Sequence, residues 1–265
     1  AEGDDMECRS SPVSAADTLR EHLWDACYGA VLTSATLTAL GSFSRVTQDL
    51  GLPESAVYER LPSPFDYYTC GELRVPAMRT DPKNPDDHTE EVADYLIDQL
   101  PASSAALVLF SSWRQMFAVL ERMPESMKNS LLVQGDLAKH EIISRHKKAV
   151  DGEQASVIFG LASFAEGVDL PGKYLTDVII TKLPFGVPDD PVDATMAEWI
   201  EMRGGNAFEE WAIPMVSMRL TQATGRLLRT EQDKGTITLL DRRVVSRRYG
   251  RKLLDALPPY RRNFA

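Results

Sequence analysis

Residues 105–123 read AALVLFSSWRQMFAVLERM, an apolar run followed by a segment with helical spacing. Every side chain from Ala105 to Phe110 is apolar, so a strand there would be buried on both faces, as in a parallel sheet. From Ser112 to Met123 the apolar residues recur every three or four positions, which predicts an amphipathic helix. Because parallel strands need a crossover between them, this unit predicts an α/β fold.

The same alternation continues along the chain. Short runs rich in Val, Ile and Leu predict further strands at Gly29–Thr33, Ser130–Gln134, Ser156–Gly160, Asp177–Thr181 and Gly235–Leu240. Segments with helical spacing predict helices at Thr89–Leu100, Ala138–Val150, Pro191–Met202, Ile213–Leu228 and Arg243–Leu257. Together they predict a parallel sheet with helices on both faces.

Pro62–Asp87 differs from its surroundings, since it is rich in proline and aspartate and only Glu72–Val75 resembles a strand. We therefore expect a linker and entry strand there, which separate residues 1–61 from a compact domain at 62–265. The first part carries candidate helices at Ala15–Cys27 and Leu40–Leu50 and one strand, too few elements for a core. With no Met at position 1, we expect the chain to begin inside a preceding domain, and its first part to be mobile or repacked.

Composition excludes several classes of protein. With 265 residues, 43% hydrophobic and 26% charged, the chain can bury a core and is not disordered in the main. No apolar run approaches the roughly 20 residues of a membrane span, and the N-terminus does not resemble a signal peptide. Cys8, Cys27 and Cys70 cannot build a disulfide framework or a four-thiolate cluster. These features predict a cytoplasmic protein that does not engage membranes.

The charge of the chain is unevenly distributed. The net charge of −10 argues against a nucleic-acid partner, because phosphate neutralisation needs Lys and Arg. From Arg226 to Arg262, however, eleven basic residues stand against four acidic ones. The sequence therefore predicts a local basic surface near its C-terminal end.

The sequence QATGRLLR at 222–229 is the strongest candidate for a functional motif. A continuous helix would place Gln222, Arg226 and Arg229 on one face. Gly225 would cost about 1 kcal/mol relative to Ala inside that helix, so we expect a ligand or another backbone to approach closely there. Arginines suit phosphate oxygens and the charge of a transferring phosphoryl group. The alternative is a surface helix whose arginines pair with nearby acids.

A second candidate is GLASFAEGVDLPG at 160–172, which follows a predicted strand. Ligands of open α/β sheets bind outside the carboxyl ends of strands, where we expect this loop to lie. Its glycines allow backbone amides to approach an anion, and Asp169 can accept from a ribose hydroxyl or from water on a metal ion. An ordinary turn between strand and helix is the alternative.

Two further strand ends carry polar residues. Ser111 and Ser112 can cap a helix, and the same helix end can hold a phosphate. At 134–136, Gln-Gly-Asp predicts a turn in which the aspartate caps the next helix. Trp113 and Tyr249 are candidates for base stacking, although burial in the core is the more ordinary role for Trp113.

Two kinds of nucleotide and metal motif are absent from the sequence. No stretch fits GxxxxGK followed by Ser or Thr, and no Asp-Glu pair follows an apolar strand. Asp86-Asp87-His88, which we expect in a proline-rich loop, is a poor substitute, and four histidines do not suggest a zinc site. A chain of this kind that acts on ATP supplies only half of the site.

Four segments resemble helicase motifs and occur in the order of that family. Thr33–Leu37 (TSATL) resembles motif III, Phe110–Ser112 (FSS) motif IV, Ser163–Asp169 (SFAEGVD) motif V and Gln222–Arg229 (QATGRLLR) motif VI. From about residue 29 onward the chain resembles the C-terminal part of bacterial DinG-type helicases, which are XPD/Rad3-related members of superfamily 2.

The resemblance implies a fold and a set of site residues. Residues 62–265 would form the second RecA-like motor domain, and residues 1–61 the tail of the first with motif III. The implied catalytic residues are Arg226, Arg229 and Gln222. The implied nucleotide-binding residues are Gly167, Asp169, Glu166 and Gly225. The implied DNA-binding residues are Ser111, Ser112, Gln134 and Ser163. ATP and Mg²⁺ would be held mainly by the first domain, which would also carry an iron–sulfur cluster, and this chain would hold no metal.

The implied function is that of an ATP-dependent 5′–3′ DNA helicase in repair or replication, of which this chain alone is inactive. The implied partners are single-stranded and forked or branched DNA and the N-terminal motor domain of the same polypeptide. One alternative is a non-catalytic RecA-like module for docking or nucleic-acid binding. Another is a self-sufficient nucleotide-binding enzyme such as a transferase, which the absent phosphate loop disfavours.

Overall fold

The computed structural model describes residues 10, 12–100, 105–186 and 190–264. The chain divides into two compact units. The sheet unit comprises Leu61–Phe185 and Met215–Ala265, and the helical unit comprises Ala1–Arg60 and Gly186–Pro214. Residues 186–214, which the sequence assigned to a domain at 62–265, thus group with the N-terminal segment.

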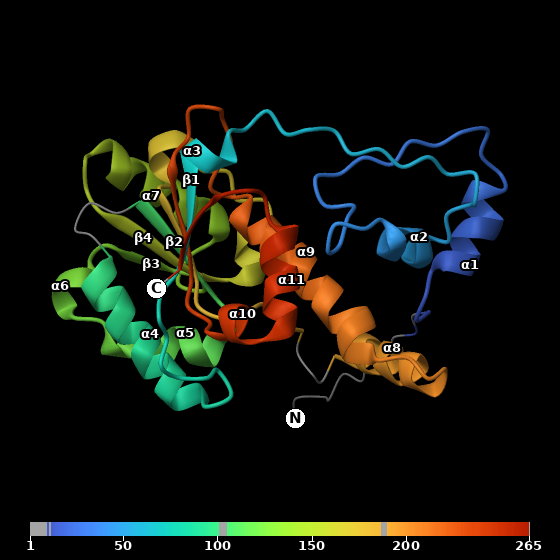
Figure 1. Cartoon of the computed structure of the whole chain (residues 1–265). Helices are drawn as coiled ribbons and strands as arrows, with labels where there is room; N and C mark the ends of the chain where they lie inside the picture. Colours follow the sequence, from blue (N-terminus) through green and yellow to red (C-terminus); the bar gives the residue numbers. More distant parts are fainter. Residues whose placement is uncertain (1–9, 11, 101–104, 187–189, 265) are drawn as a thin grey trace, which may run out of the picture. The chain divides into compact units, whose positions relative to one another are not determined.

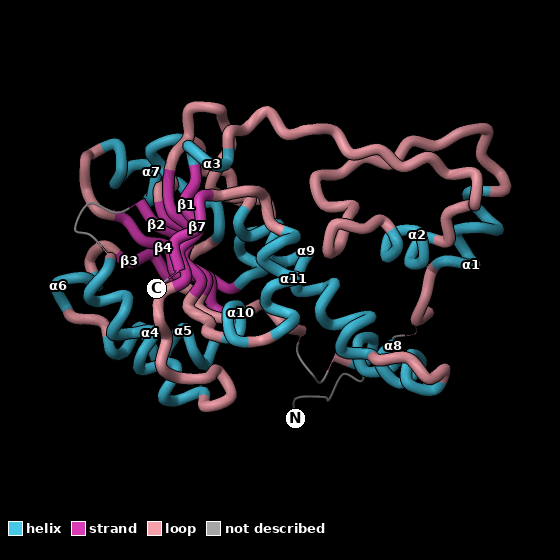
Figure 2. Tube along the Cα trace, in the orientation of Figure 1, coloured by secondary structure: helices cyan, strands magenta, loops and turns pink. Residues whose placement is uncertain are grey.

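The sheet unit contains seven parallel strands in the order β3-β4-β2-β5-β6-β1-β7. Figure 2 shows the sheet in magenta with helices in cyan around it. Their bounds are β1 Gly71–Val75, β2 Ala105–Phe110, β3 Leu131–Val133, β4 Ser156–Leu161, β5 Asp177–Ile180, β6 Gly235–Leu239 and β7 Arg261–Phe264. The predicted parallel α/β sheet is therefore confirmed. The exposed edge strand β7 was not predicted.

Helices cover both faces of the sheet, as predicted. Alternate residues of β2 (Ala106, Val108 and Phe110) share a core with α4 (Pro85–Gln99) and α5 (Trp113–Arg122). The other face carries α7 (Lys139–Asp151), α9 (Ile213–Thr224) and α11 (Arg248–Ala256). Figure 1 shows α4 and α5 on the opposite side of the sheet from α9 and α11. The shorter helices of the sheet unit are α3 Tyr67–Cys70, α6 Glu125–Lys128 and α10 Arg243–Ser246.

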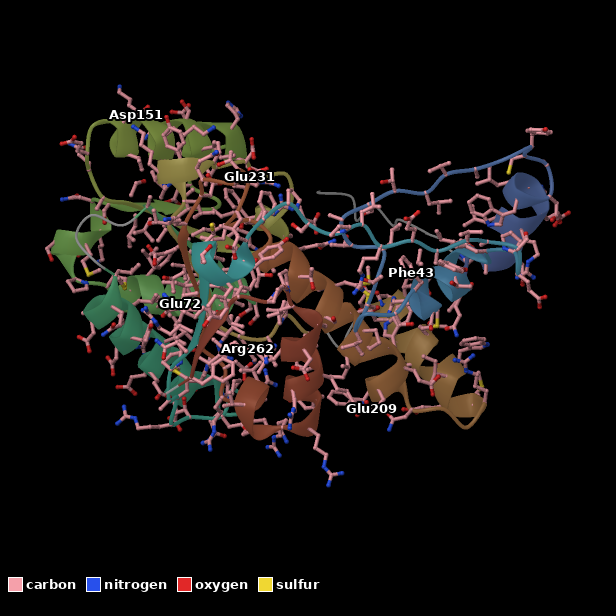
Figure 3. All side chains as sticks on the ribbon, turned by 45° about the horizontal axis from the view of Figure 1, so that its top comes forward. Phe43, Glu72, Asp151, Glu209, Glu231 and Arg262 are labelled. Carbon is pink, nitrogen blue, oxygen red and sulfur yellow. The ribbon has the colours of Figure 1, made fainter. Side chains whose placement is uncertain are left out.

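The edge strand β7 is fastened to β1 by side chains as well as by the ladder. Glu72 of β1 accepts hydrogen bonds from Arg74 (2.9 Å), Arg261 (2.6 Å) and Asn263 (3.1 Å). These hydrogen bonds lower the pKa of Glu72 to about 2. Figure 3 labels Glu72 and, on the neighbouring β7, Arg262.

Two helix boundaries in the sheet unit differ from the predictions. The helix expected from Thr89 begins at Pro85, a residue well suited to the first helical turn, so Asp86-Asp87-His88 lies on α4 and not in a loop. The helix expected over Arg243–Leu257 is interrupted at Arg247, whose backbone is extended, and is split into α10 and α11.

The crossover from β4 to β5 differs from the helical crossovers. Residues 162–176 contain two single 3₁₀ turns, Ala162–Ala165 and Gly172–Tyr174, joined by a further turn at 166–167 and a stretch without regular structure. Because β4 and β5 are parallel, this segment returns from the carboxyl end of β4 to the amino end of β5. It brings the SFAEGVD stretch over the same sheet face as α9.

The helical unit holds α1 (Ala16–Leu19), a π-helical turn at Arg20–Trp24, α2 (Ser44–Leu50), α8 (Pro191–Met202) and a second π-helical turn at Phe208–Ala212. Arg45 joins its two parts, because the guanidinium lies 4.0 Å over the Trp211 ring and donates to the Trp211 carbonyl. The prediction of a strand at Gly29–Thr33 was wrong: Val31 is 93% exposed, and the segment has no regular secondary structure and no partner strand among the described residues.

Candidate functional site

A cavity of about 230 Å³ opens beside the carboxyl ends of β2 and β5 in the sheet unit. Its walls come from the ends of the two strands with the residues that follow them, from the 162–176 crossover, and from the second half of α9 with Arg226 just beyond it. Five predicted site residues line it, namely Ser111, Ser163, Glu166, Gln222 and Arg226. Residues that the resemblance assigned to the DNA side (Ser111, Ser163) and to the nucleotide side (Glu166, Gln222, Arg226) thus line one cavity.

The two motif VI arginines converge on the crossover. Arg226 donates from Nη1 to the Val168 carbonyl (3.3 Å), and Arg229 donates from Nη2 to the same oxygen (3.2 Å). Arg229 also pairs through Nε with Oδ1 of Asp169 at 3.1 Å. Motifs V and VI are therefore joined directly by both arginines.

The prediction that one helix face carries Gln222, Arg226 and Arg229 was wrong, because α9 ends at Thr224. Arg226 and Leu227 follow in a turn, with N–H groups that donate to the carbonyls of Ala223 and Thr224. Gly225 lies just beyond the helix, and a Cβ there would lie 3.1 Å from the Thr221 carbonyl oxygen. The residue therefore serves close packing at a helix end and not in a helix interior.

The crossover is anchored at its first turn. A Cβ on Gly160 would lie 3.0 Å from the side chain of Phe164, so the chain doubles back tightly after β4. The Lys139 ammonium contacts the Glu166 carbonyl and lies 5.0 Å from the centre of the Phe164 ring. Gly167 has a φ of +70° and open space around it, so its backbone is accessible.

The cavity is cationic. Lys182, Arg219 and Arg226 line it, against one carboxylate, Glu166. Burial lowers the pKa of Arg226, and the neighbouring Arg229 lowers it further. The Nε of Arg226 is buried and has no hydrogen-bond partner among the described residues. An anionic group with oxygen acceptors would satisfy this donor and offset the positive charge.

The remaining candidates lie around the start of α5. The Ser112 hydroxyl accepts from the Gln115 amide (3.2 Å), so this serine caps the helix as predicted. Gln134 accepts from the Leu161 amide (2.8 Å), which ties the end of β3 to the end of β4. The prediction that Asp136 caps the next helix was wrong, because α7 has Ala138 at its N-cap and no side-chain cap.

Trp113 is not part of the core. It is 41% exposed and stacks on Phe117 with ring centres 5.7 Å apart. Tyr249 packs edge-on against Phe185, with ring centres 6.1 Å apart. Of the two stacking candidates, Trp113 therefore has the more accessible ring system.

Sequence reasoning missed three residues of this site. Arg219 lines the cavity and precedes Gln222 and Arg226 by three and seven positions, so the helical spacing could have indicated it. Lys182 is the second residue after β5, close to the strand-end position that indicated Ser111. Asp233, which accepts from the Arg229 amide at 2.7 Å, carried no signal of its own.

The described ranges contain neither a metal-binding cluster nor a membrane-spanning helix. Within them, no group of three or more His, Cys, Asp or Glu residues is arranged to hold a metal ion. None of the helices described is both long and apolar enough to cross a bilayer.

Comparisons with known proteins identify the family. Residues 96–260 match the family model described as the helicase C-terminal domain. The chain is 43% identical over 257 residues to the ATP-dependent DNA helicase DinG of Photobacterium profundum. This alignment covers 95% of this chain and 37% of that relative. DinG of Escherichia coli K12 is 37% identical over 254 residues, with 94% and 35% covered. The chain thus spans little more than a third of the length of these relatives.

Solved structures agree on the fold. A structure titled XPD_Helicase aligns with a TM-score of 0.57 and 22% identity over 74% of this chain and 36% of that one. Xpd4 of S. tokodaii aligns with a TM-score of 0.56 and 15% identity, over 81% and 43%. With most of the sheet unit matched by one family model, this chain belongs to the helicase C-terminal domain family and has an XPD-like fold.

Proposed function

We propose that this chain is the C-terminal motor half of an ATP-dependent DNA helicase that moves 5′ to 3′ and acts in DNA repair or replication. The observation that carries the proposal is the convergence of Arg226 and Arg229 on the Val168 carbonyl beside a cationic cavity. The names of the DinG relatives support ATP and DNA as the ligands of the whole protein.

In this proposal, Arg226 and Arg229 contact the γ-phosphate of ATP, and Gln222 helps to position it. The nucleotide side of the site is lined by Gly167, Asp169, Glu166 and Gly225. A preceding motor domain would hold the other phosphates, so transition-state charge is stabilised only when the two domains close. Arginines delivered in this way raise hydrolysis rates by roughly 10³ to 10⁵. Closure coupled to hydrolysis is what moves the DNA.

The described acidic and cysteine side chains do not fit the metal groups that the resemblance implies. Asp169 faces a guanidinium at 3.1 Å, and the Glu166 carboxylate lies in a cavity lined by three cations, so neither forms an acidic cluster. Cys27 and Cys70 are free thiols. We therefore assign no metal role to these side chains, and place Mg²⁺ and an iron–sulfur cluster with the preceding motor domain.

The DNA side of the proposal rests on Ser111, Ser112, Gln134 and Ser163. Ser111, Ser112 and Ser163 are exposed to solvent, and Ser112 lies at the start of α5. Hydroxyl and amide donors of this kind contact phosphates without reading base sequence. The proposed partners are single-stranded and forked or branched DNA.

The experiment is ATP hydrolysis by the full-length protein with and without single-stranded DNA. We expect Arg229→Ala to lower DNA-stimulated turnover by about 10³-fold, because a guanidinium aimed at the transferring phosphoryl group is lost. The affinity for single-stranded DNA should change by less than about threefold, since Arg229 faces Asp169 and not the serines. Near-normal turnover of the variant would overturn the proposed function.

A further inference from the structure

We propose that Asp233 is a positioning residue for Arg229, because its carboxylate binds the turn after motif VI and the end of the motif V crossover together. This inference rests on the proposed role of Arg229 in ATP hydrolysis. It adds a residue that lies outside both motifs and contacts no ligand itself. The turn lies where Figure 3 labels Glu231.

Both oxygens of the Asp233 carboxylate are engaged. Oδ2 accepts from the backbone amides of Arg229 (2.7 Å) and Thr230 (2.9 Å). Oδ1 accepts from the Gly172 amide at 3.1 Å and from the Thr230 hydroxyl. Four donors thus meet one carboxylate, which has about four lone-pair sites.

The electrostatics of this site favour the charged carboxylate. Asp233 is 4% exposed, and burial alone would raise its pKa. The hydrogen bonds from Thr230, Arg229 and Gly172 outweigh burial, and the pKa is lowered. Asp233 is therefore ionised at neutral pH and acts only as an acceptor.

The position of Arg229 depends on this carboxylate because the helix has already ended. α9 stops at Thr224, so the Arg229 amide has no partner within a helix and bonds to Asp233 instead. On the other side, Gly172 lies three residues after Asp169, the ion-pair partner of Arg229. Gly172 has a φ of +62°, a conformation that side-chain-bearing residues rarely adopt.

One buried anion therefore sets the distance between the two chain segments that carry Arg229 and Asp169. Loss of either amide contact lets the segments shift relative to each other. A displacement of about 1 Å at a catalytic group can cost roughly 10²-fold in rate. The two segments also hold Arg226, through the shared Val168 carbonyl.

The test is Asp233→Asn in the full-length protein. The side-chain amide of Asn has one oxygen where Asp has two. Its NH₂ group therefore faces either the backbone amides of Arg229 and Thr230 or that of Gly172, and the hydrogen bonds on that side are lost. We expect kcat of DNA-stimulated ATP hydrolysis to fall about 100-fold, while KM for ATP and the affinity for single-stranded DNA change less than about threefold. The matched control is Asp255→Asn, an exposed carboxylate paired with Arg262, which should leave kcat unchanged.

A double-mutant cycle separates positioning from a general loss of structure. In an Arg229→Ala background, Asp233→Asn should lower single-turnover hydrolysis by less than about threefold, because the group that it positions is already gone. Full additivity of the two losses would overturn the inference. Thr230→Ala, which removes only the hydroxyl donor, provides a milder variant and should lower kcat about threefold to tenfold without lowering the melting temperature by more than a few degrees.

The outcomes distinguish this inference from the function on which it rests. Normal turnover of Arg229→Ala would overturn the proposed function. Loss of turnover in Arg229→Ala, with wild-type kcat in Asp233→Asn and Thr230→Ala, would overturn only the role of Asp233.

Discussion

Two aspartate–arginine pairs in the sheet unit have opposite characters. Asp241 and Arg243, just after β6, form a fork with contacts of 2.6 Å and 2.9 Å, and their side chains are 1% and 12% exposed. Asp169 and Arg229 meet at a single 3.1 Å contact, with side chains 70% and 32% exposed. Asp241 also accepts from the Leu183 amide at 2.9 Å, so it fixes the backbone just beyond β5.

The difference separates a structural pair from one that is free to exchange partners. A buried carboxylate with a bidentate arginine and a backbone donor is satisfied, and breaking it leaves a desolvated charge. A pair exposed to water contributes little to stability, so its arginine can move to a phosphate at small cost. The residue types are identical, and the burial of the carboxylate decides which role each pair has.

The largest expected effect on stability comes from Asp241→Asn. The amide still accepts from the Leu183 amide but removes the carboxylate that pairs with the buried Arg243, at a cost of about 3–5 kcal/mol in the free energy of unfolding. Urea denaturation followed by tryptophan fluorescence measures this change.

Asp255→Asn serves as the control for that experiment. Asp255 pairs with Arg262 at 3.3 Å, and both side chains are largely exposed, so the free energy of unfolding should change by at most about 1 kcal/mol. Equal destabilisation by the two variants would show that burial does not distinguish the pairs.

Asp169→Ala should lower activity and leave stability nearly unchanged, the reverse of the effect on stability expected for Asp241→Asn. Since its ion pair is exposed, the free energy of unfolding should change by less than about 1 kcal/mol. Turnover of ATP with DNA should fall about tenfold, because Arg229 keeps its guanidinium but loses an orienting partner. Parallel measurements of kcat and of urea denaturation test both halves.

A loss of stability as large as that of Asp241→Asn would make the Asp169 pair structural and contradict the comparison. Unchanged turnover would show that the Val168 carbonyl alone orients Arg229.

The sequence predicts the sheet well where strands have neighbours. Ala105–Phe110 and Gly29–Thr33 are similarly apolar runs, but only the first is flanked by two strands, β4 and β5, and is buried. Val31 in the second is 93% exposed. The composition of a segment indicates that it can form a strand. Whether the strand forms depends on a neighbouring strand that pairs with it, which the segment's own sequence does not specify.

The candidate site was predictable where local motifs carry it. Ser111, Ser163 and Gln222 were picked out by their motifs, and the structure brings all three to one cavity. The helical spacing of Arg226 and Arg229 was misleading, since α9 ends before both. They lie together because both guanidiniums donate to the Val168 carbonyl of the crossover. Asp233 acts through an amide 61 positions away, at Gly172, and no pattern of residue types encodes such a contact.

The smallest expected effect is a pH dependence that belongs to the structural pair. His88 lies next to it: Nε2 donates to the Leu240 carbonyl (2.8 Å), and Nδ1 lies 3.2 Å from Nε2 of Gln115. Burial lowers the pKa of His88 below its ordinary value of 6.5, although the Leu240 carbonyl and Asp241 oppose this. The folded protein therefore favours the neutral form of His88.

As the pH falls through about 6.5, the unfolded chain binds a proton at His88 that the folded chain does not bind. The free energy of unfolding should hence be constant above that pH and decrease below it, by at most about 1.4 kcal/mol per pH unit for one histidine. His146, buried between Ser156 and Tyr174, has a lowered pKa and adds to the same trend.

Urea denaturation between pH 7.5 and 5.5 measures this slope above the range in which carboxylates titrate. His88→Gln should reduce the slope whatever its effect on absolute stability, because Gln has no titrating group, and the remainder should disappear when His146→Gln is added. A slope that survives both substitutions would place the acid sensitivity elsewhere. Neither histidine contacts Arg226 or Arg229 in the structure, so the slope should be the same in the Arg229→Ala background. An unchanged slope would distinguish the structural Asp241–Arg243 pair from the exposed Asp169–Arg229 pair by a second, independent measurement.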